Sequence, residues 1–146
     1  MSAEAVAAVQ TALGTEHAAL WTYGLVSAFL GQQQANAVAE GSNAHRARRD
    51  TTERWLRDNG ATPQPPAPAY LPPQPVSDGR SSLAALVAVE NDTCAAWRGV
   101  LERTDDQNLR KAALDALTAA SVRATRWRKV AGTTPASIAF PGVASG

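Results

Sequence analysis

The sequence has little of what would stabilise any fold other than packed helices. Its single cysteine, Cys94, excludes an internal disulfide framework and any zinc site built from several cysteines. It contains 2 phenylalanines and 2 tyrosines against 31 alanines. Because alanine favours helices whereas aromatic and β-branched residues favour strands, this composition predicts an all-α protein stabilised by packing.

Long apolar runs and an excess of one charge are also lacking. No stretch approaches the roughly 20 apolar residues that span a bilayer, and the first residues do not form a basic segment followed by a hydrophobic one. The 14 basic and 13 acidic residues leave a formal net charge of +1, too small to draw the protein onto nucleic acid. We therefore expect a soluble, cytoplasmic protein with no membrane or nucleic-acid partner, and one domain over residues 1–146.

Apolar residues recur every three or four positions in four stretches of the chain, which is the spacing of one face of an α-helix. In the first stretch these positions include Val6, Leu13 and Leu20. Thr104 and Gln107 have the spacing of a capping box that starts the last helix. The predicted helices cover residues 2–30, 34–59, 78–103 and 105–131.

Two short connections and one long one set the predicted topology. The first two helices and the last two are joined by only a few residues, so each pair should form an antiparallel hairpin. Residues 61–77 hold seven of the nine prolines, and an extended segment of this kind reaches roughly 50 Å. That reach exceeds the roughly 39 Å of the second helix, so the segment can cross the whole bundle. A flexible tether between two separate hairpins is the alternative.

The C-terminal tail, residues 133–146, follows the last predicted helix. It contains two prolines around an apolar stretch that ends in Phe140. We expect the tail to pack Phe140 back onto the bundle.

Three ionisable side chains interrupt the apolar faces near the middle of three different helices. They are Glu16 in the first helix, His45 in the second and Glu90 in the third. A buried charge is costly unless it is paired or binds a metal. The sequence therefore predicts a polar layer across the middle of the bundle.

Five short strings, together with Glu16 and Glu90 on their helical faces, carry a resemblance to a known family. The strings are Glu16-His17-Ala18-Ala19, Ala44-His45-Arg46-Ala47-Arg48-Arg49-Asp50, Gly60-Ala61-Thr62-Pro63, Ala95-Ala96-Trp97-Arg98 and Arg123-Ala124-Thr125-Arg126-Trp127-Arg128. The chain resembles the ferritin-like superfamily, and more closely an uncharacterised, mostly actinobacterial, ferritin-like domain family of unknown function. The resemblance covers roughly residues 3–142 and implies a ferritin-like four-helix bundle with a long crossover between its second and third helices.

The resemblance also implies where a di-iron site would lie. Metal-binding members of the superfamily use one glutamate from each of the first and third helices and a Glu-x-x-His motif from each of the others. Glu16 and Glu90 match the lone glutamates, and Ser42 to His45 keeps the histidine but has serine in place of glutamate. The fourth helix contains no glutamate and no histidine. We therefore predict no cofactor and no intact di-iron site.

Three alternatives remain for the central residues. Arginine pairs well with buried carboxylates, and the arginines nearest by level along the bundle are Arg48 and Arg49 for Glu16, and Arg123 for Glu90. Glu16, His45 and Glu90 could instead form a residual single-metal site for Fe or Mn. In the third alternative the helical register is off by one residue, and these side chains face solvent.

Other candidates have plainer interpretations. Cys94 lies on an apolar face without a histidine partner, so we expect an inert buried thiol. His17 points about 100° away from Glu16 and is expected on the surface. The four tryptophans, one in each helix, indicate packing and not a cofactor site. No phosphate-binding loop, dinucleotide fingerprint or nucleophile elbow is present.

These observations favour a binding protein over an enzyme. We predict a small-molecule or protein interaction module, without catalytic residues, that forms a homodimer through a flat alanine-rich helix face. The alternative is a residual Fe- or Mn-binding protein with oxidase or stress-related activity.

Overall fold

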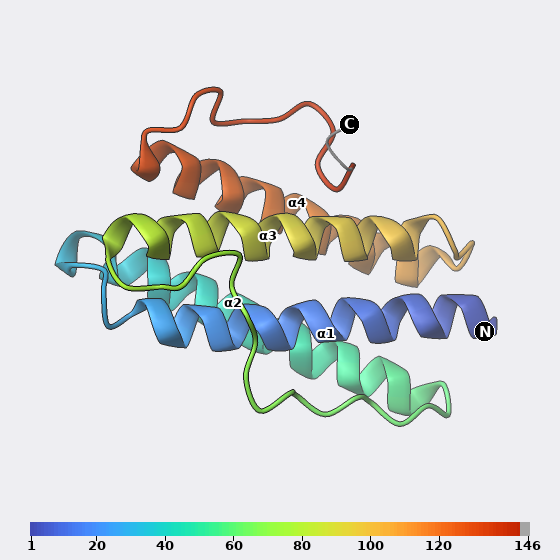
Figure 1. The fold of residues 1–146 in the computed structure, drawn as a ribbon. Coiled ribbons are helices and arrows are strands. Elements are labelled where there is room, and N and C mark those ends of the chain that lie inside the picture. Colours follow the sequence, from blue (N-terminus) through green and yellow to red (C-terminus); the bar gives the residue numbers. More distant parts are fainter. Residues whose placement is uncertain (144–146) are drawn as a thin grey trace.

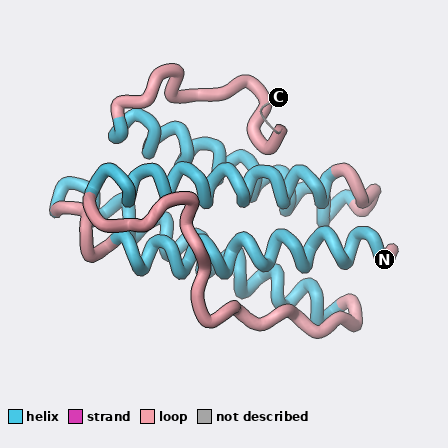
Figure 2. Tube along the Cα trace, viewed as in Figure 1, coloured by secondary structure: helices cyan, strands magenta, loops and turns pink. Residues whose placement is uncertain are grey.

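The computed structural model describes residues 1–143, which form four α-helices and no strand (Figure 1, Figure 2). The helices are α1 (Ala3–Val26), α2 (Gln32–Asp58), α3 (Gly79–Leu101) and α4 (Gln107–Ala131). The all-α helical bundle expected from the composition is confirmed. Residues 144–146, the end of the expected tail 133–146, lie outside the described residues. None of the four helices combines the length and apolarity that crossing a bilayer requires.

Polar N-caps decide where α1 and α3 begin. The Ser2 hydroxyl accepts the backbone N–H of Ala5 at 3.1 Å. Asp78 and Ser81 form a capping box, in which each side chain accepts the backbone N–H of the other. Each cap satisfies N–H groups that have no partner inside the helix.

α4 begins at a different cap from the one expected. The carboxylate of Asp106 accepts the N–H of Leu109 at 2.8 Å, whereas the Thr104 hydroxyl accepts the N–H of Asp106 itself. The expected capping box of Thr104 and Gln107 is therefore wrong. An ionised carboxylate three residues before Leu109 is the stronger acceptor for the first turn.

The connection between α1 and α2 is longer than expected because α1 ends at Val26. The Ser27 hydroxyl donates back to the carbonyl of Gly24 at 2.7 Å, and residues 27–30 form tight turns. Gly31 then acts as the N-cap of α2 and not as the C-terminal stop of α1.

The four helices pack unevenly. α3 packs against both α1 and α4, and α1 packs against α2. Within residues 1–143, α2 and α4 barely approach each other, although both lie behind the layer formed by α1 and α3 (Figure 1). The side of the bundle between α2 and α4 is therefore its open side.

The apolar core is divided into two clusters along the bundle. One contains Leu13, Leu56 and Trp97, and the other contains Tyr23 and Leu86 among its buried members. Buried polar residues of α1, α2 and α3 lie at the level between these clusters. The polar layer thus crosses the bundle between two apolar layers.

The segment between α2 and α3, residues 59–78, follows the outer surface of α1 (Figure 1). Gln10 bonds through its side chain to the backbone of Thr62 and Gln64. A ring nitrogen of His17 lies 3.0 Å from the carbonyl oxygen of Gln64. His17 is therefore buried beneath this segment and not on the surface as expected, because the proline-rich chain covers that face of α1.

The backbone of the tail beyond α4 accepts a hydrogen bond from the bundle. Arg128 donates to the carbonyl of Ala136 at 3.2 Å and to Asn91 at 2.6 Å. Phe140 is 72% exposed, so the expectation that it packs onto the bundle is wrong. A side chain of α4, Arg128, therefore bonds to the backbone of this segment.

Two glycines inside helices give a matched test of this packing. A Cβ at Gly41 of α2 would overlap the ring of Tyr23, whereas a Cβ at Gly14 of α1 would meet nothing within 4 Å. We expect Gly41→Ala to destabilise the fold by about 1 to 3 kcal/mol through overpacking. Gly14→Ala should instead stabilise it by up to about 1 kcal/mol through helix propensity. Urea unfolding measures both, and equal effects of the two variants would contradict the close approach of α2 to Tyr23.

Candidate functional site

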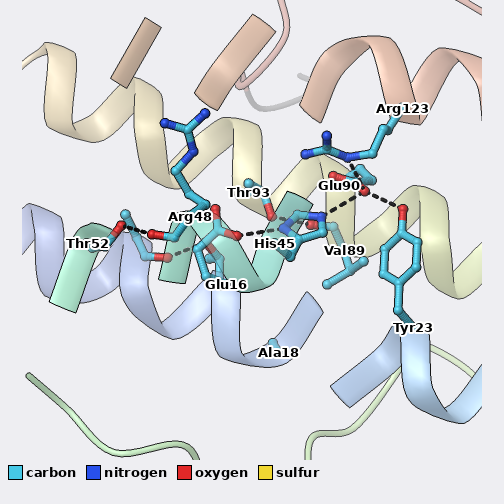
Figure 3. A network of polar contacts seen from close by, with 12 residues as sticks. Glu16, Ala18, Tyr23, His45, Arg48, Thr52, Val89, Glu90, Thr93 and Arg123 are labelled. Carbon is cyan, nitrogen blue, oxygen red and sulfur yellow. Dashed lines mark hydrogen bonds and ion pairs between the residues drawn. The ribbon is translucent and has the colours of Figure 1, made fainter. Parts of the chain in front are cut away.

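The centre of the site is the imidazole of His45 on α2, which lies between two carboxylates (Figure 3). Its Nδ1 is 2.6 Å from Oε2 of Glu16 on α1, and its Nε2 is 2.9 Å from Oε2 of Glu90 on α3. All three side chains are at most 1% exposed. Because carboxylates only accept hydrogen bonds, both ring nitrogens must donate, and this arrangement fits the imidazolium.

The pKa of His45 reflects this geometry. Burial by itself lowers the pKa, but the hydrogen bonds and charges of Glu16 and Glu90 outweigh burial and raise it to about 9. His45 therefore carries a positive charge at neutral pH.

Glu90 is the most heavily bonded member of the layer. Its Oε2 accepts from His45, from the Tyr23 hydroxyl at 2.5 Å and from Nε of Arg123 on α4 at 3.0 Å. Burial favours the neutral acid, but His45, Arg123 and Tyr23 together hold the pKa of Glu90 below its usual value. The remaining oxygen, Oε1, is buried without a partner among the described residues. Glu90 is therefore the carboxylate through which α1, α2 and α4 all bond to α3.

Aromatic side chains complete the network. Trp97 donates its indole N–H to Oε1 of Glu16 at 3.0 Å, and Trp127 donates to the Tyr23 hydroxyl at 2.9 Å. Burial, followed by the nearby charge of Glu90, raises the pKa of Tyr23, so this hydroxyl stays protonated.

The sequence pattern predicts packing roles for the tryptophans and does not single out Tyr23. A signal was present, because Tyr23 follows Glu16 by seven residues and Trp97 follows Glu90 by seven. Seven residues are about two helical turns, which places each aromatic on the same face as a buried glutamate.

The structure brings together four of the six residues expected in the layer: Glu16, His45, Glu90 and Arg123. Arg48 and Arg49 do not join them. The Arg48 guanidinium points away from His45 (Figure 3) and reaches the carbonyl of Ala112 at 3.5 Å. Arg49 pairs with Asp50 at 2.8 Å and lies 3.8 Å from Glu53.

The expected pairing of Glu16 with Arg48 or Arg49 is therefore wrong. Position along the helix places these arginines at the level of Glu16, but their direction around α2 turns them to other partners. His45 and Trp97 satisfy Glu16 instead.

The side chains of the layer do not fit a metal centre. Each nitrogen of His45 faces a different carboxylate, so no single position is open to His45, Glu16 and Glu90 together. The Arg123 guanidinium donates a hydrogen bond to Glu90, and α4 supplies no histidine or carboxylate at this level. Over residues 1–143, no cluster of three His, Cys, Asp or Glu side chains has a metal-binding arrangement.

A cleft opens between α2 and α4, beside the polar layer. We call it the α2–α4 cleft, and its cavity volume is about 170 Å³. Its floor includes Arg123 and Trp127, which bond into the network, and Gly41, which lies against the Tyr23 ring. Its lining residues are Ala37, Glu40, Gly41 and Ala44 from α2, and Arg123, Arg126, Trp127 and Val130 from α4.

Comparison with known proteins identifies a family and a closely similar solved structure. A family model described as a domain of unknown function (DUF4439) matches residues 8–145. The chain is similar to the crystal structure of a conserved hypothetical protein from Mycobacterium tuberculosis, with 38% sequence identity and a TM-score of 0.86. That match covers 94% of this chain and 97% of the other. No curated protein matches the sequence.

The raised pKa of His45 predicts a stability that falls with pH. Below about pH 6.5 the imidazole is charged in both the folded and the unfolded chain, so its stabilisation is complete. Between about pH 6.5 and 9 the unfolded chain loses the proton while the folded chain keeps it. The free energy of unfolding should fall by about 1.4 kcal/mol per pH unit, or about 3 kcal/mol in all. Urea unfolding at a series of pH values measures this slope.

The variant His45→Gln is the control for that slope. It should be less stable at neutral pH but nearly independent of pH over the same range. An equal slope in the variant and the native chain would show that His45 is not the titrating group.

Removing one buried charge tests the network directly. Glu90→Gln keeps the shape of the side chain but leaves His45 and Arg123 short of a counter-charge, so we expect a loss of about 3 to 5 kcal/mol. The matched variant is Glu102→Gln at the C-cap of the same helix, which breaks an exposed pair with Arg98 at 3.1 Å. That loss should stay below about 1 kcal/mol. Similar losses in urea unfolding at pH 7 would contradict a stabilising role of the buried layer.

Proposed function

The chain belongs to the DUF4439 family of unknown function, and we propose that it is a ferritin-like binding protein whose α2–α4 cleft holds a small molecule. In this proposal the polar layer is a positioning device and not a catalytic centre. The homodimer expected from the sequence stays a prediction.

The ferritin-like assignment is supported by connectivity and by residue positions. Two helical hairpins are joined by the long segment 59–78, which is the arrangement of bundles with one crossover connection. Glu16 on α1 and Glu90 on α3 resemble the lone glutamates of metal-binding ferritin-like bundles, and His45 on α2 resembles one of their histidines. We propose descent from a metal-binding bundle that has lost the glutamate of its second helix and the Glu-x-x-His motif of its fourth.

The charges of the layer support the loss of the metal. In a di-metal bundle, cations balance the inward-facing carboxylates. Here the imidazolium of His45 and the guanidinium of Arg123 balance Glu16 and Glu90, so the four side chains sum to zero charge. A bound cation would have to displace one of these groups.

The observation that carries the proposal is the anchoring of the cleft floor. Arg123 is held by Glu90, and Trp127 is held by Tyr23 through its indole N–H. Ligand sites bind well when their polar groups are oriented before the ligand arrives, because less ordering entropy is lost on binding. A floor of this kind, at the open side of the bundle, favours a preformed binding site.

The described side chains favour binding over covalent catalysis. Burial and the nearby charge of Glu90 raise the pKa of the Cys94 thiol to about 11, so it is not a thiolate at neutral pH. Tyr23 and His45 both donate protons that are held in hydrogen bonds to carboxylates.

A small apolar probe tests the proposal. We expect fluorobenzene to shift the indole N–H resonance of Trp127 saturably in a nitrogen–proton NMR spectrum, because Trp127 lines the cleft. The indole N–H of Trp97, at the Glu16 end of the network, is the internal control and should not shift. Ala44→Leu fills the cleft and should weaken binding at least about tenfold, that is, by about 1.4 kcal/mol.

The matched variant is Ala47→Leu, which adds the same side chain to an exposed position on α2. It should leave the titration unchanged. Equal binding by Ala44→Leu and Ala47→Leu, or no response at Trp127, would refute the cleft as a binding site.

A further inference from the structure

The two walls of the α2–α4 cleft carry opposite charges. α2 and α4 run in opposite directions (Figure 1), and each contributes residues three or four positions apart, which form one face of a helix. Glu40 lies on the α2 wall, and Arg126 lies on the α4 wall. Arg123 adds a second guanidinium deeper in the cleft, where its side chain is 19% exposed.

These charged groups have unused bonding capacity. Arg123 bonds to Glu90 through Nε alone, which leaves its two terminal nitrogens without a partner in residues 1–143. Over the same residues, neither Arg126 nor Glu40 forms an ion pair or a side-chain hydrogen bond, although both line one small cavity. The α4 wall thus offers donors for a carboxylate, and the α2 wall offers one acceptor for an ammonium group.

The remaining lining and the size of the cleft restrict the ligand further. The lining also includes Trp127, Val130, Ala37 and Ala44, which provide an apolar surface. The cavity volume of the cleft is about 170 Å³. A cleft of this volume has room for a molecule of amino-acid size.

Resting on the proposed function of this cleft, we infer that its ligand is a small zwitterion with an apolar body, of the chemical class of an apolar α-amino acid. The carboxylate binds the guanidinium groups of Arg123 and Arg126, the ammonium group binds Glu40, and the side chain packs against Trp127 and Val130. Glu40 also disfavours ligands with two negative charges, such as phosphates and dicarboxylates, by like-charge repulsion.

Three compounds of similar shape separate the contributions of the carboxylate and the ammonium group to binding. L-leucine carries both charges, 4-methylpentanoate lacks the ammonium group, and 3-methylbutylamine lacks the carboxylate. We expect leucine to bind the full chain at least about tenfold more tightly than either analogue, measured by calorimetry and by the Trp127 indole resonance. Glycine, which lacks the apolar body, should bind more weakly than leucine by a similar factor.

Two exposed charged residues on the cleft walls, Arg126 and Glu40, are the positions of the test variants. Arg126→Gln should weaken the binding of leucine and of 4-methylpentanoate about tenfold. The binding of 3-methylbutylamine should not change. Glu40→Gln should remove the tighter binding of leucine relative to 4-methylpentanoate. The affinity for 4-methylpentanoate should not change. Lys129→Gln, which removes an exposed charge outside the lining of this cleft, should change none of the three.

Each outcome separates this inference from the proposed function. Equal binding of leucine and 4-methylpentanoate, or a Glu40→Gln variant that still prefers leucine, would overturn the zwitterion. If none of the three compounds binds but fluorobenzene still distinguishes Ala44→Leu from Ala47→Leu, the zwitterion fails and the binding cleft stands. If fluorobenzene fails as well, the proposed function fails with it.

Discussion

The charged hydrogen bonds of His45 to Glu16 and Glu90 are the interaction on which the rest of the structure depends. They join α2 to α1 and α3 at the middle of the bundle, and Arg123 joins α4 to the same layer through Glu90. Each helix thus contributes one charge, and the charges cancel. Because an unpaired buried charge costs several kcal/mol, this layer admits few alternative arrangements of the helices. It is most important for α2, which buries few apolar side chains of its own.

The same network shapes the open side of the molecule. Glu90 orients Arg123, and Tyr23 orients Trp127, so two floor residues of the α2–α4 cleft are held by bonds that begin in the core. Gly41 lets the backbone of α2 approach the ring of Tyr23 closely. The cleft is therefore not a gap left by poor packing but a surface whose polar groups are positioned from within.

Much of the candidate site could be predicted from interruptions of the apolar pattern. Glu16, His45 and Glu90 were identified because each interrupts an apolar helical face, and a charge at such a position demands a partner. The choice of partner was only partly predictable. Counting residues from a hairpin gives the height of a side chain along the bundle but not its direction around the helix. By its height along the bundle alone, Arg48 is equivalent to the residues that bond to Glu16.

The sequence by itself determined the four helices and the need for a compensated polar layer, because helix periodicity and the cost of buried charge act locally along the chain. The length of segment 59–78 could also be predicted from the sequence. That this segment buries His17 could not be predicted. Only the tertiary structure decided that the imidazolium of His45 and the indole of Trp97, rather than Arg48 or Arg49, satisfy Glu16. It alone decided that α2 and α4 stand apart around a cleft. The physical reason is that these outcomes depend on the rotation of each helix about its axis and on the spacing between axes, which the packing of all four helices sets together.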